Sequence, residues 1–137
     1  MGADIRIYME YLERKTNKYK CIGKFDGDRL YGVFGIIAGV RSDIKPIYPP
    51  RGLPIDVNDS IYKEYKGEPE YHTASWLSTS ELRECLDAVY EIIRKEEEEA
   101  GRTYNPDWAK SYEQIYNYMK SSEEDGDPTR IVFWFDN

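Results

Sequence analysis

The chain has 137 residues, of which 40% are hydrophobic and 15% are aromatic, and its formal net charge is −7. This length suits one domain whose core needs no disulfide or metal to fold. The acidic balance argues against non-specific binding to the phosphate backbone of nucleic acids, and no apolar run is long enough to span a bilayer. We therefore expect a single domain over residues 1–137 in the cytoplasm, with no membrane partner and with Cys21 and Cys85 reduced.

The first predicted elements are the two strands of a hairpin. Residues 4–13 alternate between two faces, which predicts a strand with one face buried and the other in solvent. The buried face carries Ile5, Ile7, Met9 and Tyr11, and the other face carries Asp4, Arg6, Tyr8 and Glu10. Residues 19–25 predict a second strand, and Thr16 and Asn17 suit the turn between the two.

A short helix and a long loop are predicted next. Tyr31, Phe34 and Ile37 share one helical face, which favours a helix over residues 31–38 that ends near Gly39. Residues 41–56 contain four prolines. Because proline fixes φ at about −65° and restricts the residue before it, this loop should hold a defined shape and form one wall of a binding site.

Two longer helices are expected in the second half of the chain, after one helical turn near residue 60 and an extended segment that ends near residue 77. Ser78 and Glu81 match a capping box, and apolar residues at three- and four-residue spacing continue the first helix over residues 82–99. Asn105 suits the N-cap of the second helix, with proline at its first position, and this helix should cover residues 106–121.

The last predicted element is a strand over residues 130–135. Its nearly continuous apolar sequence predicts a strand that is covered on both faces, and we expect it to pair with the first strand. The predicted fold is therefore of the α+β class, a small, mainly antiparallel sheet packed by two longer helices and one short helix.

The single histidine, His72, excludes several chemistries. Two-histidine phosphoesterases need a second histidine. A structural zinc site needs four ligands, usually Cys and His, and the chain has only three such residues in total. No P-loop, G-x-G-x-x-G or G-x-S-x-G motif is present, so we expect no metal and no cofactor. A carboxylate-rich magnesium or calcium site stays open, because the chain has 26 acidic residues, although none of them forms a loop motif such as the EF-hand. A Ser/His/Asp triad with Ser75, Ser78 or Ser80 stays open, as do structural, ligand-binding and acid/base roles for His72.

The arginines of the proline-rich loop are the stronger signal. Arg41 and Arg51 offer planar forks of donors that match carboxylates and phosphates, and Lys45 lies between them in sequence. Trp76 and Tyr48 can stack on a base or ring. The alternatives are that these cations pair with nearby carboxylates and pin the loop, and that the aromatic residues pack in the core.

Four short motifs carry a resemblance to a known family. They are Met1-Gly2-x-Asp4-Ile5-x-x-Tyr8-x-Glu10, Ala38-Gly39-Val40-Arg41, Pro50-Arg51-Gly52-Leu53-Pro54-x-Asp56-Val57 and His72-Thr73-x-Ser75-Trp76-Leu77. Together they resemble a family of small, largely uncharacterised proteins of phages and bacterial prophages. Many relatives carry Cys and His where this chain has Ala3 and Arg6. The resemblance implies a phage or prophage origin and a site formed by Asp4, Arg41, Arg51, Asp56, His72 and Trp76.

Three functions are compatible with these residues. The first is binding of a small anionic, nucleotide-like ligand, which in a phage could sequester a host defence signal. The second is hydrolysis of phosphoester or glycosidic bonds, with Asp4, Glu10 or Asp56 and His72 in acid/base roles. The third is binding and inhibition of a host macromolecule through an acidic surface that includes residues 96–99.

Overall fold

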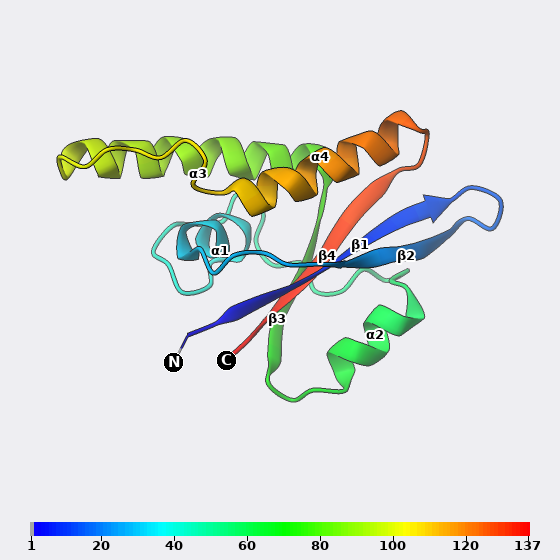
Figure 1. Cartoon of the computed structure of the whole chain (residues 1–137). Coiled ribbons are helices and arrows are strands. Elements are labelled where there is room, and N and C mark those ends of the chain that lie inside the picture. Colours follow the sequence, from blue (N-terminus) through cyan, green and yellow to red (C-terminus); the bar gives the residue numbers. More distant parts are fainter. Residues whose placement is uncertain (1) are drawn as a thin grey trace.

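The computed structural model describes residues 2–137 and consists of a four-stranded antiparallel sheet with helices on both faces (Figure 1). The strands, in the spatial order β2-β1-β4-β3, are β1 (Asp4–Glu13), β2 (Lys18–Phe25), β3 (Tyr71–Ser78) and β4 (Thr129–Asp136). The helices are α1 (Tyr31–Ala38), α2 (Asp59–Lys66), α3 (Thr79–Glu99) and α4 (Lys110–Glu124). The predicted α+β class is confirmed, and the helical turn expected near residue 60 is α2.

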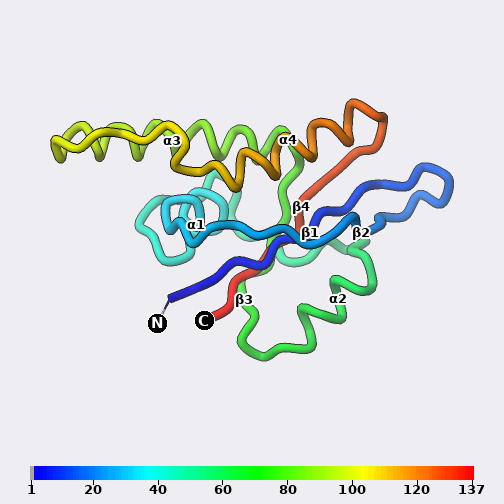
Figure 2. Tube along the Cα trace, viewed as in Figure 1, coloured from blue at the N-terminus to red at the C-terminus, as the bar shows by residue number. Residues whose placement is uncertain are grey.

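The sheet separates two layers of helices. α1, α3 and α4 cover one face, and α2 lies with the preceding loop against the other (Figure 1). The two ends of the chain lie side by side in Figure 2, because Asp4 of β1 is opposite Asp136 of β4. Segments from both ends of the sequence can therefore contribute to one site.

The predicted hairpin and the predicted pairing of the first and last strands are both confirmed. β1 pairs antiparallel with β2 on one side and with β4 on the other. Asn17 turns the hairpin with a positive φ of 57°, a conformation that asparagine tolerates better than most residues. All residues of β4 except Asp136 are buried, as expected for a strand covered on both faces.

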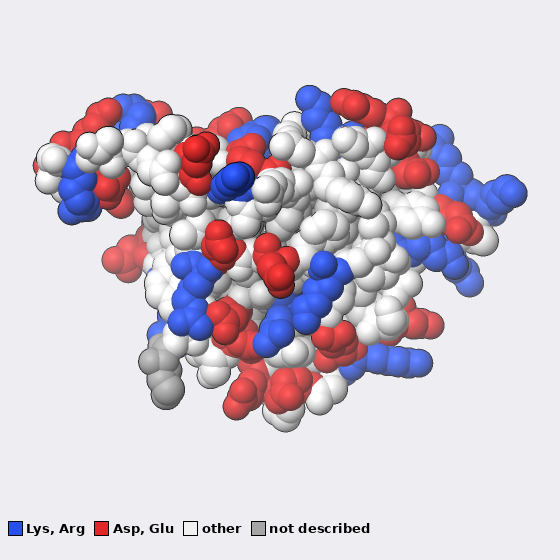
Figure 3. Space-filling view, viewed as in Figure 1, with Lys and Arg blue, Asp and Glu red and all other residues white. Residues whose placement is uncertain are grey.

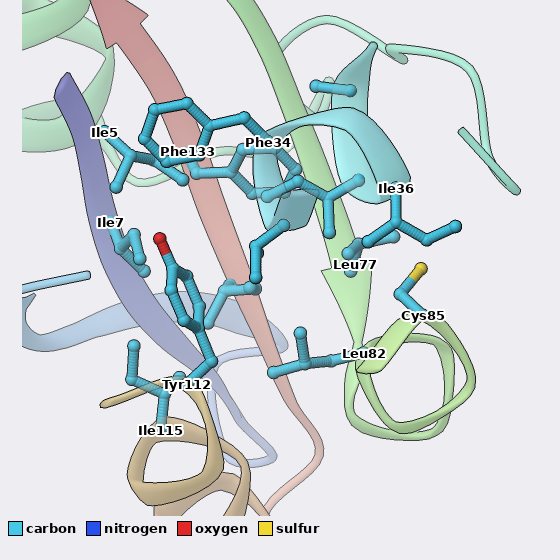
Figure 4. Packing of buried hydrophobic residues seen from close by; sticks show 14 of the residues in the cluster. Ile5, Ile7, Phe34, Ile36, Leu77, Leu82, Cys85, Tyr112, Ile115 and Phe133 are labelled. Carbon is cyan, nitrogen blue, oxygen red and sulfur yellow. The ribbon is translucent and has the colours of Figure 1, made fainter. Parts of the chain in front are cut away.

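The main core fills the space between the sheet and the helices α1, α3 and α4. Figure 4 shows Ile7 of β1, Phe133 of β4 and Phe34 of α1 meeting Leu82 of α3 and Tyr112 of α4. Each of these side chains is 1% exposed or less. Complete burial of one such apolar side chain stabilises the fold by about 1.5–3 kcal/mol, so this layer fixes the positions of all three helices.

A smaller core lies under α2, on the other face of the sheet. Ile61 of α2 packs near Tyr8, Ala74 and Trp134, and the rings of Tyr8 and Trp134 stack with their centroids 5.3 Å apart. The prediction that this face of β1 lies in solvent holds for Asp4 but is wrong for Tyr8 and Glu10, which are 7% and 0% exposed. The loop that precedes α2, together with α2, covers this face of β1, which the alternation of residues 4–13 alone assigns to solvent.

The predicted start of α3 and the predicted end of α1 are both confirmed. Ser78 caps α3 in the predicted capping box, with its hydroxyl accepting from the Glu81 N–H and its own N–H donating to the Glu81 carboxylate. Gly39 ends α1 as predicted, at a φ of 70°. No helix in residues 2–137 is both long and apolar enough to cross a membrane.

The predicted start of α4 is wrong by four residues. Asn105 caps a tight turn instead, accepting the Asp107 N–H on its side chain at 3.0 Å and the Trp108 N–H on its carbonyl at 3.1 Å. The helix begins only at Lys110, because Ala109 has a φ of −111° and a ψ of 39°, outside the helical region.

Candidate functional site

An open cleft lies on the α2 side of the sheet, beneath the proline-rich loop. It has a volume of about 580 Å³ and is lined by Arg51, Leu53, Pro54, Ile55, Asp56, Trp76 and Arg130. We call it the Arg51–Arg130 cleft. The loop reaches it by crossing the sheet, because residues 51 and 52 contact β3 while Asn58 contacts β1 and β2.

An irregularity in β3 anchors the loop. The register of β3 against β4 shifts between His72 and Ser75, and Thr73 has a positive φ of 57°. The backbone N–H of Arg51 donates to the buried Ser75 hydroxyl at 3.0 Å, and the Gly52 N–H donates to the Ala74 carbonyl at 2.9 Å. The bulge therefore fixes where the loop enters the cleft.

The Arg51 side chain is held by a carboxylate and by two rings. Its guanidinium donates to both oxygens of Glu81, at 2.8 and 2.5 Å, and to the Trp76 carbonyl at 3.1 Å. Its central carbon lies 4.4 Å from the Trp76 ring centroid and 4.7 Å from that of Tyr48. The hydrogen bonds from Arg51 hold the pKa of Glu81 below its ordinary value. Arg51 thus follows the alternative in which a loop arginine pairs with a carboxylate and pins the loop.

Arg130, which lines the cleft, forms a buried ion pair with Glu10. They are opposite each other across β4 and β1. The Arg130 Nε donates to Glu10 at 2.6 Å, and their side chains are 8% and 0% exposed. Glu10 also accepts the backbone N–H of Asn58 at 2.7 Å. The Arg130 guanidinium lies 3.4 Å from the centroid of the Tyr19 ring, which fixes its plane.

The other partner of Arg130 is far more exposed. Asp56 accepts from Arg130 Nη1 at 2.9 Å, and its side chain is 65% exposed. The cleft therefore contains one guanidinium that is fixed on its Nε side by a buried carboxylate and meets a solvent-accessible carboxylate on its other side. That second position is an anion position filled by a side chain of the same protein.

Three of the six predicted site residues come together in this cleft. They are Arg51, Asp56 and Trp76. The other three lie elsewhere. Arg41 is exposed, directly after α1, with a φ of 55°.

Asp4 and His72 lie at the end of the sheet where the two chain ends meet. We call this group, with Arg6, Arg29 and Asp136, the terminal cluster. Its charges are paired, because Arg29 donates to Asp4 at 2.7 Å and Arg6 donates to Asp136 at 2.5 Å. His72 contacts Thr73 through Nδ1 and Asn137 through Nε2, at 2.8 and 2.5 Å.

The arrangement of residues 2–137 supplies no catalytic triad. The Ser75 hydroxyl accepts from the backbone N–H of Arg51, the Ser78 hydroxyl caps α3, and the Ser80 hydroxyl contacts that of Ser78, so none of the three bonds to His72. Asp56 lines the cleft and Glu10 pairs with Arg130 of that lining, whereas His72 lies in the terminal cluster. No group of three or more His, Cys, Asp or Glu residues suited to a metal occurs within the described residues.

The acidic run at the end of α3 is interleaved with cations. Arg94 pairs with Glu91 and Glu98, and Arg102 pairs with Glu97. Figure 3 shows blue and red side chains side by side at this end of α3, at the upper left. The run does not form a uniformly acidic surface.

Sequence reasoning missed Arg130 as a site residue and placed Glu10 in solvent. The burial of this pair could have been predicted by combining two predictions about the last strand, its coverage on both faces and its pairing with the first strand. A last strand covered on both faces, paired with the first strand, requires that the second face of the first strand is covered as well. Opposite charges on two such neighbouring strands then favour a buried cross-strand pair.

Comparison of the chain with protein-family models, with curated proteins and with solved structures gives no match.

Proposed function

We propose that the protein binds a small ligand that combines an anionic group with a planar ring, as a nucleotide does, in the Arg51–Arg130 cleft. The observation that supports this most directly is the contact between Asp56 and Arg130, in which an exposed carboxylate occupies an anion position on a buried guanidinium. A ligand phosphate or carboxylate replaces Asp56 there and receives the Nη donors of Arg130.

The magnitudes of the three ion pairs indicate which one a ligand displaces. A pair with an exposed member contributes about 0–1 kcal/mol, whereas hydrogen bonds to charged groups in less exposed positions contribute about 1.5–3 kcal/mol. Asp56 belongs to the first class. Glu10 is fully buried and Glu81 binds Arg51 through both oxygens, so these two carboxylates stay in place.

Trp76 supplies the surface for the ring. Its indole centroid lies 4.4 Å from the guanidinium carbon of Arg51 and 5.9 Å from that of Arg130, so a ligand ring contacts the part of the indole that these side chains leave uncovered, next to the anion position. Stacking of a base on an aromatic side chain contributes about 1–3 kcal/mol. Arg51 then acts by holding Trp76 and the loop, and the anion goes to Arg130. In a phage, a protein of this kind could sequester a nucleotide signal of the host, a step that depends on the motif resemblance.

The test is a thermal-shift and calorimetry screen against nucleoside mono-, di- and triphosphates, cyclic nucleotides and ADP-ribose. Ligand at a hundredfold excess over Kd stabilises the fold by about 2.7 kcal/mol. Mass spectrometry of the recovered ligand separates the alternatives, because an intact ligand means binding and an altered one means hydrolysis.

Variants then locate the site. Asp56→Asn should tighten binding several-fold, because it removes the competing carboxylate, and Trp76→Leu should weaken it by about 5- to 150-fold. Lys95→Gln removes an exposed positive charge from α3 and serves as the control. An affinity that falls in Asp4→Asn or His72→Ala but not in Trp76→Leu would place the ligand at the terminal cluster and refute this proposal.

A further inference from the structure

A second hollow, of about 650 Å³, lies between α4 and the β1–β2 hairpin, on the opposite side of the sheet from the Arg51–Arg130 cleft. One side of it is a stripe along α4 at helical spacing, formed by Gln114, Asn117, Tyr118, Ser121 and Ser122. None of these five residues is charged, although charged residues make up 33% of the chain. The charged residues Lys120, Glu123 and Glu124 line a different hollow, beside the start of α3.

The other side and one end of the hollow differ in character. The hairpin contributes Tyr11 and Ile22, and Asp125 and Asp127 lie at the C-terminal end of α4. Tyr118 is 50% exposed, and its ring packs edge-on against Phe25 of β2 with the centroids 5.4 Å apart. The hollow therefore offers a braced aromatic ring, amides and hydroxyls along its length, and carboxylates at one end.

We propose that this hollow binds a neutral sugar ring. Amide and hydroxyl side chains both donate and accept hydrogen bonds, as sugar hydroxyls do, and a carboxylate can accept from two hydroxyls at once. The ring of Tyr118 provides a flat surface for the apolar C–H face of a sugar. No Lys or Arg is among the lining residues that the structure describes, so the hollow does not favour an anion.

The surrounding surface agrees with a neutral ligand. Figure 3 shows a largely white stretch between the charged side chains of the upper helices and those at the tip of the hairpin, on the right. This second site is independent of the Arg51–Arg130 cleft, because the two share no lining residue.

The test is saturation-transfer NMR with glucose, galactose, mannose and N-acetylglucosamine, followed by titration of any sugar that binds and of its linked trisaccharide. A single ring should bind with a Kd on the order of 1 mM, as expected for so small a ligand. Tyr118→Ala should weaken binding by about three- to tenfold through loss of the aromatic surface, and Asn117→Ala should also weaken it.

Tyr62→Ala is the matched control, because Tyr62 of α2 is 48% exposed and lies outside this hollow. Its affinity for the sugar should equal that of the unaltered protein. The proposal is overturned if no sugar of the panel or its trisaccharide binds, or if Tyr118→Ala and Tyr62→Ala behave alike. It is also overturned if spermidine binds in place of the sugars and is lost in Tyr118→Ala, since the hollow would then be a cation site.

Discussion

Removal of the guanidinium of Arg130 should destabilise the protein more than removal of any exposed arginine. In Arg130→Met, the carboxylate of Glu10 stays 0% exposed and keeps only the backbone N–H of Asn58 as a partner. An uncompensated buried charge of this kind costs about 3–5 kcal/mol. The total stability of a domain is about 5–15 kcal/mol, so the melting temperature should fall by roughly 10–20 °C.

The assay is equilibrium unfolding in urea, followed by circular dichroism, for a double-mutant cycle. The partner variant is Glu10→Gln, which keeps an amide oxygen for the Asn58 N–H and removes the charge. The double variant Arg130→Met/Glu10→Gln should recover at least about 2 kcal/mol relative to Arg130→Met, because no buried charge remains. Arg94→Met is the control, since its partners lie on the exposed side of α3 and its unfolding curve should stay close to that of the unaltered protein.

Two results would refute this reasoning. If Arg130→Met unfolds at the same urea concentration as Arg94→Met, the Glu10 carboxylate is not desolvated as described. If the double variant is no more stable than Arg130→Met, the loss in Arg130→Met does not come from an unpaired Glu10 charge, and lost packing of the Arg130 side chain on Tyr19 accounts for it.

Three further predictions concern the main core and α4. The hydrogen bonds from Arg83 hold the pKa of Glu113 below its ordinary value of 4.5. The ionised carboxylate therefore stabilises the fold above pH 4.5, and this stabilisation is lost as the pH falls through the lower pKa of the folded state. Glu113→Gln should flatten the fall in unfolding free energy between pH 5 and about pH 3. Burial raises the pKa of the Cys85 thiol to about 12, so a disulfide reagent at pH 8 should modify Cys85 only at the rate of unfolding. Immediate modification of Cys85 in the native protein, as distinct from the partly exposed Cys21, would contradict its burial. Leu86→Ala should cost about 2–5 kcal/mol in urea unfolding, because Leu86 is 0% exposed, and a loss below 1 kcal/mol would mean that the core collapses around the cavity.

Local sequence signals predicted the elements whose formation depends on local chemistry. The alternation of β1, the capping box of α3 and the glycine after α1 each specify one arrangement through residues that are close in sequence. The start of α4 shows the limit of this approach. Asn105 does accept a neighbouring N–H as a cap does, but the i→i+3 bonds from Trp108 and Lys110 form two tight turns, and the chain enters the helix only after Ala109.

The candidate site depends on strand register, which local patterns do not contain. Glu10 is opposite Arg130 because β1 and β4 pair in one register, and a shift of either strand by one residue would turn its member of the pair to the other face of the sheet. The bulge at Thr73, which gives Arg51 its position, is likewise a property of how β3 pairs with β4. Local patterns therefore selected the loop and Trp76, whereas Arg130 follows only when the predicted pairing of the first and last strands is combined with the predicted coverage of the last strand.

The same register bears on the proposed binding of an anion, for which we assign a paired arginine rather than an unpaired one. Arg41 was predicted to bind the anion, and it forms no salt bridge within residues 2–137. An exposed arginine, however, loses about 1.5–2 kcal/mol of side-chain freedom when a ligand fixes it. Arg130 has already lost that freedom in folding, because Glu10 fixes its Nε and Tyr19 fixes its plane, so its remaining donors point to one place before any ligand arrives. In the proposed function, a ligand has only to displace Asp56, the most exposed partner of Arg130.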